Sequence, residues 1–150
     1  MNKRLLLLLF LPLFFISCLS DGEEVVKFYT DYQEGIKVAT EANRPILLIF
    51  AAYASPTGKP LGLLHDPELK TVLKQHVCIL LMTDDRTVLA NGETQGAVNT
   101  ELQRSYGHNF QPCLLKLTPD LQPIGAPGGY MTSKKEFLHF IFSTQSSNVN

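Results

Sequence analysis

Two short segments of this chain are continuously apolar, at residues 46–50 and 77–82, and a third at 113–117 is largely so. A strand covered on both faces of its sheet has such a run, whereas a strand with one face in water alternates apolar and polar residues. The pattern therefore predicts three buried strands, and a further short strand is expected at 25–29.

Between these segments, polar capping residues precede stretches in which apolar residues recur every three or four positions. Thr30 and Gln33 have the spacing of a capping box, and so do Thr100 and Gln103. Helices are therefore expected at 30–41 and 100–106, after the N-cap Asp66, and from 133 onward, with 83–99 as a polar surface excursion. Residues 121–126 should pair back as an antiparallel edge. This order predicts an α/β fold, a three-layer sandwich with a mixed central sheet.

The first 24 residues have a different composition and are expected to lie outside this fold. Lys3 and Arg4 precede an apolar stretch at 5–16, and Ser17-Cys18 follows it. This layout predicts a lipoprotein signal peptide at 1–17, lipidation of Cys18 and an acidic tether at 18–24. The alternative is an ordinary signal peptide cleaved nearby, with Cys18 incidental. The remaining chain divides into a domain at 25–143 and a polar tail at 144–150, in a protein of the bacterial cell envelope that faces the periplasm or the cell surface.

Charge and composition narrow the possible partners. The chain has 13 Lys and Arg against 14 Asp and Glu, and no basic run, so a nucleic-acid partner is not expected. Its histidines are scattered, without the spacing of metal ligands, and neither a metal nor a cofactor is expected. These histidines are His65, His76, His108 and His139.

Four motifs occur in a fixed order along the chain. An Arg-Pro pair, an apolar strand and an aromatic residue occupy 44–53, and Asp-Pro-Glu occupies 66–68. A segment ending in Gln111-Pro112 precedes the third strand, and Gly129-Tyr130 precedes the last helix. The ordered set resembles the thioredoxin-like superfamily, and within it the C-terminal domain of the periplasmic thiol:disulfide interchange (cytochrome c biogenesis) proteins. The resemblance covers roughly residues 25 to 142.

In that family, a Cys-x-x-Cys dithiol follows the aromatic residue. Here Tyr53 is followed by Ala54-Ser55-Pro56-Thr57, so both sulfurs are missing. Dithiol exchange needs a thiolate and a second, resolving thiol. Ala54 offers no nucleophile, and no base is evident for the hydroxyl of Thr57. The resemblance therefore implies a degenerate site, at which Ser55 and Thr57 are expected only to cap the following helix.

The resemblance also implies a peptide-binding groove. Pro112 matches the family's cis-proline, and the alternative is an ordinary trans proline at the start of a strand. In active members this loop holds an extended substrate strand. We therefore expect Tyr53, Ser55, Phe110, Gln111 and Pro112 to bind an extended peptide or envelope protein.

Two cysteines remain within the expected domain, Cys78 and Cys113. The family topology places the 46–50 strand between theirs, and two strand spacings are about 9.6 Å, whereas a disulfide needs Cα atoms within about 7 Å. We therefore predict separate thiols. Cys113 directly follows Pro112, and either a lone reactive thiol or a small buried hydrophobe is compatible with that position.

Three functions follow from these features. The first is a lipid-anchored, redox-inactive binding, chaperone or accessory module in envelope protein maturation. The second is a thiol-disulfide oxidoreductase that uses Cys113 or a partner's cysteine. The third is a structural lipoprotein whose groove binds nothing.

Overall fold

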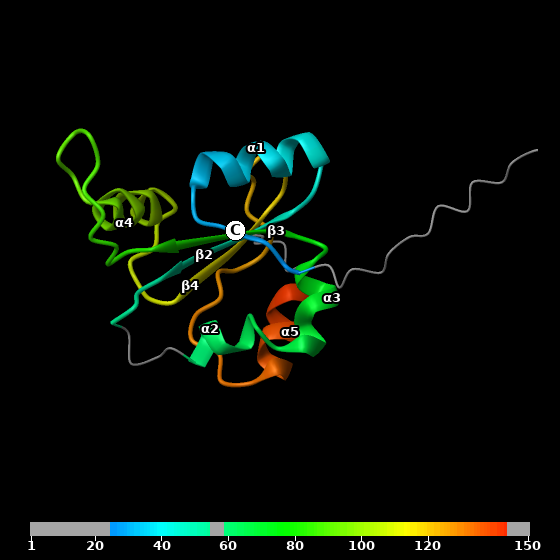
Figure 1. Ribbon diagram of the computed structural model, residues 1–150. Coiled ribbons are helices and arrows are strands. Elements are labelled where there is room, and N and C mark those ends of the chain that lie inside the picture. The colour runs from blue at the N-terminus through cyan, green and yellow to red at the C-terminus, as the bar shows by residue number, and fades with distance from the viewer. Residues whose placement is uncertain (1–24, 55–58, 144–150) are drawn as a thin grey trace, which may run out of the picture.

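The computed structural model describes residues 25–54 and 59–143, so the expected leader, tether and tail, together with Ser55 and Thr57, lie outside the described residues. The described chain forms a mixed sheet with helices on both faces (Figure 1). Its elements are β1 (Phe28–Tyr29), α1 (Tyr32–Ala42), β2 (Ile46–Ala51), α2 (Lys59–Leu63), the 3-10 turn η1 (Pro67–Leu69), α3 (Lys70–Leu73), β3 (Val77–Met82), α4 (Gln95–Ser105), β4 (Cys113–Leu117) and α5 (Lys134–Phe142).

The four strands lie in the order β1-β3-β2-β4. β1, β3 and β2 are parallel, and β4 is antiparallel to β2, with Phe50 opposite Cys113. The apolar segments at 46–50, 77–82 and 113–117 are thus confirmed as strands, and β2 continues one residue further to Ala51. The predicted position of β2 between the two cysteine-bearing strands is also confirmed.

All six residues of β2 are buried, and alternate residues face opposite layers. Leu48 and Phe50 pack with residues of α1 and α4, whereas Leu47 and Ile49 pack with residues of α3 and α5. In Figure 1, α1 and α4 accordingly lie above the sheet, and α2, α3 and α5 lie below it. A strand between two apolar layers has apolar residues facing both of them, which explains the continuous apolar run at 46–50.

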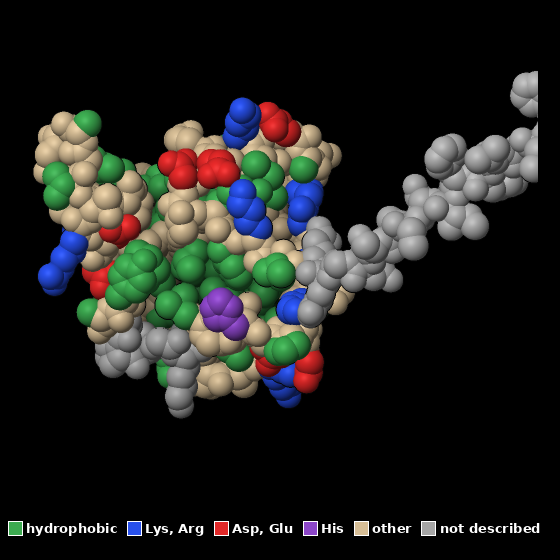
Figure 2. Space-filling view, viewed as in Figure 1, with side chains coloured by type: hydrophobic (Ala, Val, Ile, Leu, Met, Phe, Trp, Pro, Cys, Tyr) green, Lys and Arg blue, Asp and Glu red, His purple; other side chains and the backbone are tan. Residues whose placement is uncertain are grey.

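The sheet is most open at the β1 edge, because β1 has only two residues. Figure 2 shows this face, where hydrophobic side chains form a band between α1 and α2, with charged side chains above it on α1. Among the described residues, no helix has the length and apolar character needed to cross a membrane.

Two of the predicted helix caps, Asp66 and Ser133, are confirmed, and two, Thr30 and Thr100, are wrong. Asp66 accepts a hydrogen bond from the Glu68 amide ahead of η1, and Ser133 begins α5 with a complete capping box. The N-cap of α1 is Asp31, whose carboxylate accepts from the Glu34 amide at 2.7 Å, and not Thr30. Thr30 and Asp31 are adjacent, and both residue types occur at helix N-caps. The sequence alone therefore did not show which of the two caps α1.

The predicted start of α4 is also wrong. The helix begins at Gln95, where the Thr94 hydroxyl accepts a hydrogen bond from the Ala97 amide. Thr100 lies inside the helix, and its hydroxyl donates to the Gly96 carbonyl at 2.8 Å. The first turn of α4 carries little apolar periodicity, so the later Thr100–Gln103 spacing was mistaken for the cap. The surface excursion is correspondingly shorter, and a Val88–Thr94 bridge closes it.

The return segment after β4 pairs antiparallel with that strand, as predicted, but through isolated bridges and without a regular strand. Leu117 pairs with Pro123, and Leu114 pairs with Gly128 through two hydrogen bonds of 2.8 Å. A proline cannot donate to a strand ladder, which interrupts the pairing at Pro123.

Lys116 lies in the middle of β4 and is only 4% exposed. Its ammonium donates to the carbonyl oxygens of Phe140, at 2.6 Å, and Ile141, at 3.2 Å, and also to the carbonyl of Ser143. These carbonyls belong to the last turn of α5 and lack partners within the helix. A buried cation therefore caps α5 from the central sheet, which explains a lysine in an otherwise apolar strand.

Candidate functional site

The expected groove lies at the end of the sheet where β2 finishes and β4 begins. Because Phe50 is opposite Cys113, the residues after β2 and the residues before β4 leave the sheet side by side. Tyr53 and Ala54 therefore lie at the same end of the sheet as Pro112. The resemblance predicts that the segment after β2 lies beside the proline loop before β4. The structure confirms this for Tyr53, Ala54 and Pro112.

The peptide bond between Gln111 and Pro112 is cis, as predicted. The ring of Pro112 is buried, and the side chain of Gln111 is exposed. The side-chain Nε2 of Gln111 donates to the Thr83 hydroxyl, which in turn donates to the Ala51 carbonyl at 3.0 Å. A short polar chain therefore connects the cis-proline loop to the ends of β3 and β2.

Asp84 is a site residue that sequence reasoning missed. Its two carboxylate oxygens accept hydrogen bonds from the backbone amides of Tyr53 and Ala54, each at 2.9 Å. The bond from Ala54, followed by that from Tyr53, lowers the pKa of Asp84 below its ordinary value. Its position directly after a buried strand was the available signal, because the ends of parallel strands β2 and β3 meet at one edge. Asp84 thus holds the start of the loop that follows β2.

Replacing Asp84 with alanine should leave the Tyr53 and Ala54 amides without an acceptor. We expect a loss of about 0.5–1 kcal/mol in the free energy of unfolding, small because the site is partly exposed to water. Exchange of these two amides with deuterium should also become faster. A carboxylate with a lowered folded-state pKa stabilises the fold above its unfolded pKa and loses this effect as pH falls through the folded value.

The pH dependence provides the control for this prediction. The difference in unfolding free energy between the wild type and Asp84→Asn should be present at pH 7 and should shrink below about pH 4. A difference that stays constant across this range would contradict a role for the carboxylate charge.

Gln103, on α4, supports the other side of the groove. It is 2% exposed, and its side-chain amide donates to the Phe110 carbonyl at 2.6 Å. One turn earlier, Asn99 donates to the Met82 carbonyl at the end of β3 at 2.8 Å. The interpretation of Gln103 as a capping residue is therefore wrong. Buried amides four residues apart on α4 instead fix the two backbone segments that frame the groove.

Aromatic side chains are exposed around this end of the sheet. Tyr53 is 73% exposed and Phe110 is 40% exposed. A Cβ atom at Gly129 would lie 3.6 Å from the Phe110 ring. The rings of His108 and Phe110 pack edge to face, with their centres 5.6 Å apart. An open depression of about 490 Å³ adjoins Tyr53 and is also lined by Ala54, Asp84, Asp85 and Arg86.

The cysteines are separate, as predicted, and the structure shows that both are buried. Burial raises the pKa of the Cys113 thiol to about 11, although a hydrogen bond with Gln103 opposes the shift. Burial also raises the pKa of Cys78 to about 12. Roughly one Cys113 in 10,000 is then a thiolate at neutral pH, so a lone-thiol mechanism has little nucleophile available. Elsewhere in the described chain, no three His, Cys, Asp or Glu residues gather closely enough to hold a metal ion.

Strand order β1-β3-β2-β4, helices on both faces and a cis-proline loop beside the end of β2 define a thioredoxin-like fold. Solved structures of this class share the fold of the chain. The oxidised C-terminal domain of DsbD from Neisseria meningitidis is 16% identical with a TM-score of 0.59, covering 79% of this chain and 100% of that domain. A thioredoxin from Thermus thermophilus is 19% identical with a TM-score of 0.59, covering 79% and 85%.

The DsbH oxidoreductase is also similar, at 18% identity and a TM-score of 0.57, covering 75% of this chain and 82% of that one. These comparisons confirm the predicted resemblance at the level of the fold. A scan against protein-family models finds no match, and neither does a sequence comparison with curated proteins.

Proposed function

We propose that this protein is a lipid-anchored envelope protein whose thioredoxin-like domain binds an extended peptide of a partner protein without exchanging thiols. One observation carries the proposal. A cis-proline loop with an exposed Gln111 faces a β2 loop that is fixed by Asp84 and has Ala54 where the family has a cysteine. The groove is thus braced on both sides, and its described part contains no accessible sulfur.

The backbone at Gln111 supports binding by strand addition. Along β4, the outer edge is already occupied, because Leu114 pairs with Gly128 and the Lys116 carbonyl accepts from Ile124. No backbone hydrogen bond from the described residues reaches the N–H or C=O of Gln111. An extended peptide can therefore pair at this point, just ahead of the strand, where the loop still offers a donor and an acceptor.

Side chains around this backbone favour a peptide with apolar residues. Tyr53, after β2, and Phe110, in the cis-proline loop, both present exposed rings. Alternate side chains of an extended peptide point to opposite sides, so one side can contact these rings. Partner proteins that are still unfolded expose such segments, which fits an accessory role in envelope protein maturation.

The location rests on the sequence of the first 24 residues. A basic start, an apolar stretch and Ser17-Cys18 support export and lipidation at Cys18. Mass spectrometry of the protein from envelope fractions tests this part. A mature N-terminus at Cys18 carrying acyl chains is expected, and an unmodified N-terminus downstream of Cys18 would contradict it.

The peptide-binding proposal is tested by capture of thiol-blocked peptides on the anchored protein. Gln111→Pro removes the N–H that pairs with the peptide, and we expect at least about a tenfold loss of binding from this hydrogen bond and the altered backbone. Gln33→Pro is the matched control, because Gln33 lies in the first turn of α1, where proline is tolerated. Equal binding by wild type and Gln111→Pro would refute a strand-pairing groove at this loop.

Gln103 provides a second variant that does not touch the peptide. Gln103→Leu removes the buried donor to the Phe110 carbonyl, and the loss of this partly buried hydrogen bond costs about 1 kcal/mol. We expect a corresponding loss of stability by chemical unfolding, together with weaker peptide binding under conditions where the variant is fully folded. Unchanged affinity in the folded variant would mean that α4 does not position the groove.

A further inference from the structure

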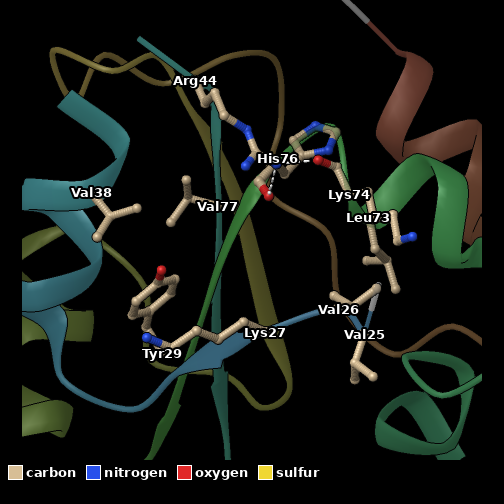
Figure 3. Close-up of a pocket in the computed structure, with 10 residues that line it drawn as sticks. All are labelled: Val25, Val26, Lys27, Tyr29, Val38, Arg44, Leu73, Lys74, His76 and Val77. Atoms are coloured by element: carbon tan, nitrogen blue, oxygen red, sulfur yellow. Dashed lines mark hydrogen bonds between the residues drawn. The ribbon is translucent and has the colours of Figure 1, made fainter. Parts of the chain in front are cut away.

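A second cavity lies at the opposite end of the sheet from the groove. Its volume is about 200 Å³, and it opens between β1, α1 and the starts of β2 and β3 (Figure 3). β2 has six residues, so this end lies about 20 Å from the loop after the strand. The cavity is therefore separate from the peptide-binding site.

Polar atoms make up more than half of the exposed surface of this cavity, but six of the ten residues that line it have apolar or aromatic side chains. These six include Val38, Leu73, Val77 and Tyr29. In Figure 3, the Tyr29 hydroxyl points toward the space between Val77 and Arg44. These side chains can contact a compact hydrocarbon or aromatic group, and the polar atoms among them can bind a charged group on the same ligand.

Cationic side chains surround the same space. Lys27 and Arg44 both line the cavity, and no Asp or Glu does so among the described residues. The Lys27 ammonium lies 4.0 Å from the centre of the Tyr29 ring, and its carboxylate partner Glu34 is 3.2 Å away. That ion pair is exposed to solvent on both sides, so water weakens it and a ligand can compete for the ammonium.

Arg44 is held rigidly at the cavity. Its Nη2 donates to the carbonyl oxygens of His76, at 2.8 Å, and Lys74. A guanidinium has five N–H donors, and those on Nε and Nη1 have no hydrogen-bond partner within the part of the chain described. The remaining donors match a carboxylate, which arginine binds through two parallel hydrogen bonds.

His76 adds a polar group without adding charge. Its Nδ1 lies 3.0 Å from the Val72 carbonyl, and burial lowers its pKa, so the ring is neutral at pH 7. With Nδ1 donating to that carbonyl, Nε2 is an acceptor. The positive charge at the cavity therefore comes from the lysine and arginine side chains.

We propose that this cavity binds a small monocarboxylic acid with a compact apolar body, its carboxylate at Arg44 and Lys27 and its apolar part against Val38 and Val77. Drug-sized ligands occupy pockets of about 300–1,000 Å³, so the smaller volume selects a short aliphatic or single-ring acid.

An NMR titration of the full chain in detergent micelles tests the proposal, with phenylacetate as the probe. We expect saturable shifts of the Tyr29 and Val77 amides and none at Gln111. Phenylacetamide, the neutral analogue, should bind at least about tenfold more weakly, because it lacks the charge-assisted hydrogen bonds. Inorganic phosphate should not displace phenylacetate, because it cannot make the additional contacts with the apolar side chains of Val38 and Val77.

Two variants separate charge from shape. Lys27→Gln changes an exposed side chain and should weaken phenylacetate about three- to tenfold while the protein stays folded. Val38→Phe fills the cavity and should abolish binding. Equal binding of phenylacetate and phenylacetamide, displacement by phosphate, or the absence of shifts at Tyr29 and Val77 would overturn the proposal. None of these outcomes bears on peptide capture at Gln111.

Discussion

Gly96→Ala is expected to lower the free energy of unfolding by about 1–3 kcal/mol, even though alanine is the better helix former. Gly96 lies in the first turn of α4, where a Cβ atom would be 2.6 Å from the Thr83 carbonyl oxygen and 2.7 Å from the Asp85 amide nitrogen. Both are backbone atoms of the turn after β3, and they cannot rotate away as a side chain can. The helix or the turn must therefore shift.

The same substitution at Gly62 is the matched control. Gly62 lies in the short helix α2, and a Cβ atom there would have no heavy atom within 4 Å. Gly62→Ala should be neutral or stabilising by about 0.5–1 kcal/mol, because it restricts the unfolded chain without a clash. Thermal unfolding of both variants measures the contrast, since 1 kcal/mol shifts the midpoint by about 4 °C in a domain of this size.

The Gly96 substitution also tests the link between α4 and the groove. The turn that it displaces carries Asp84, which binds the Tyr53 and Ala54 amides. We expect the NMR signals of these two amides to move in Gly96→Ala and to remain in place in Gly62→Ala. A Gly96→Ala protein as stable as the wild type would show that this helix start has more room than the backbone geometry indicates.

The sheet could be predicted from sequence because its signal is local. β2 and β3 lie between two helical layers, so each appears as an unbroken apolar run whose predicted limits agree with those of the strand to within one residue. Asp66 and Ser133 were found for the same reason, since a cap and the amide that it binds lie two or three residues apart. The cis-proline followed from an ordered set of motifs, and no single dipeptide would have been enough.

The residues that brace the site could not be predicted, because their partners are distant in sequence. Asp84 binds amides about thirty residues earlier in the chain, and Lys116 binds carbonyls about twenty-five residues later. Only the fold brings these groups together. In the sequence, Asp84 reads as a polar turn residue and Lys116 as an interruption of a strand. Gln103 is closer to its partner Phe110, but the wrong start for α4 assigned it to a cap.

These braces bear directly on what the site can do. An active dithiol site needs a thiolate at the start of the loop, and a nearby cation or helix N-terminus lowers the thiol pKa for this purpose. Here the carboxylate of Asp84 binds the amide of Ala54. A negative charge at this point disfavours a second one. Residues 53–57 thus contain no cysteine, and the Asp84 carboxylate would raise the pKa of a thiol placed at residue 54.

Ala54→Cys combined with Thr57→Cys should therefore introduce only weak thiol-disulfide exchange. The wild type and the single variant Ala54→Cys should give no insulin reduction above the buffer rate, because both lack a resolving thiol in the loop and Cys113 is buried. The double variant should form an intramolecular disulfide and turn over measurably. This result would support the alignment of both positions with the family's dithiol.

Adding Asp84→Asn to the double variant should raise its activity about three- to fourfold at pH 7, because a thiolate of lower pKa is more abundant but less nucleophilic. Asparagine keeps an oxygen that can accept from the backbone amides, but it removes the charge. We expect the pKa of the introduced thiol to fall by about one unit, which gives about ten times more thiolate wherever that pKa lies above the assay pH. The pH profile of thiol alkylation measures the shift directly. An unchanged profile would rule out Asp84 as an electrostatic obstacle, and a double variant that forms no internal disulfide would instead contradict the assignment of residues 54 and 57 to the degenerate motif.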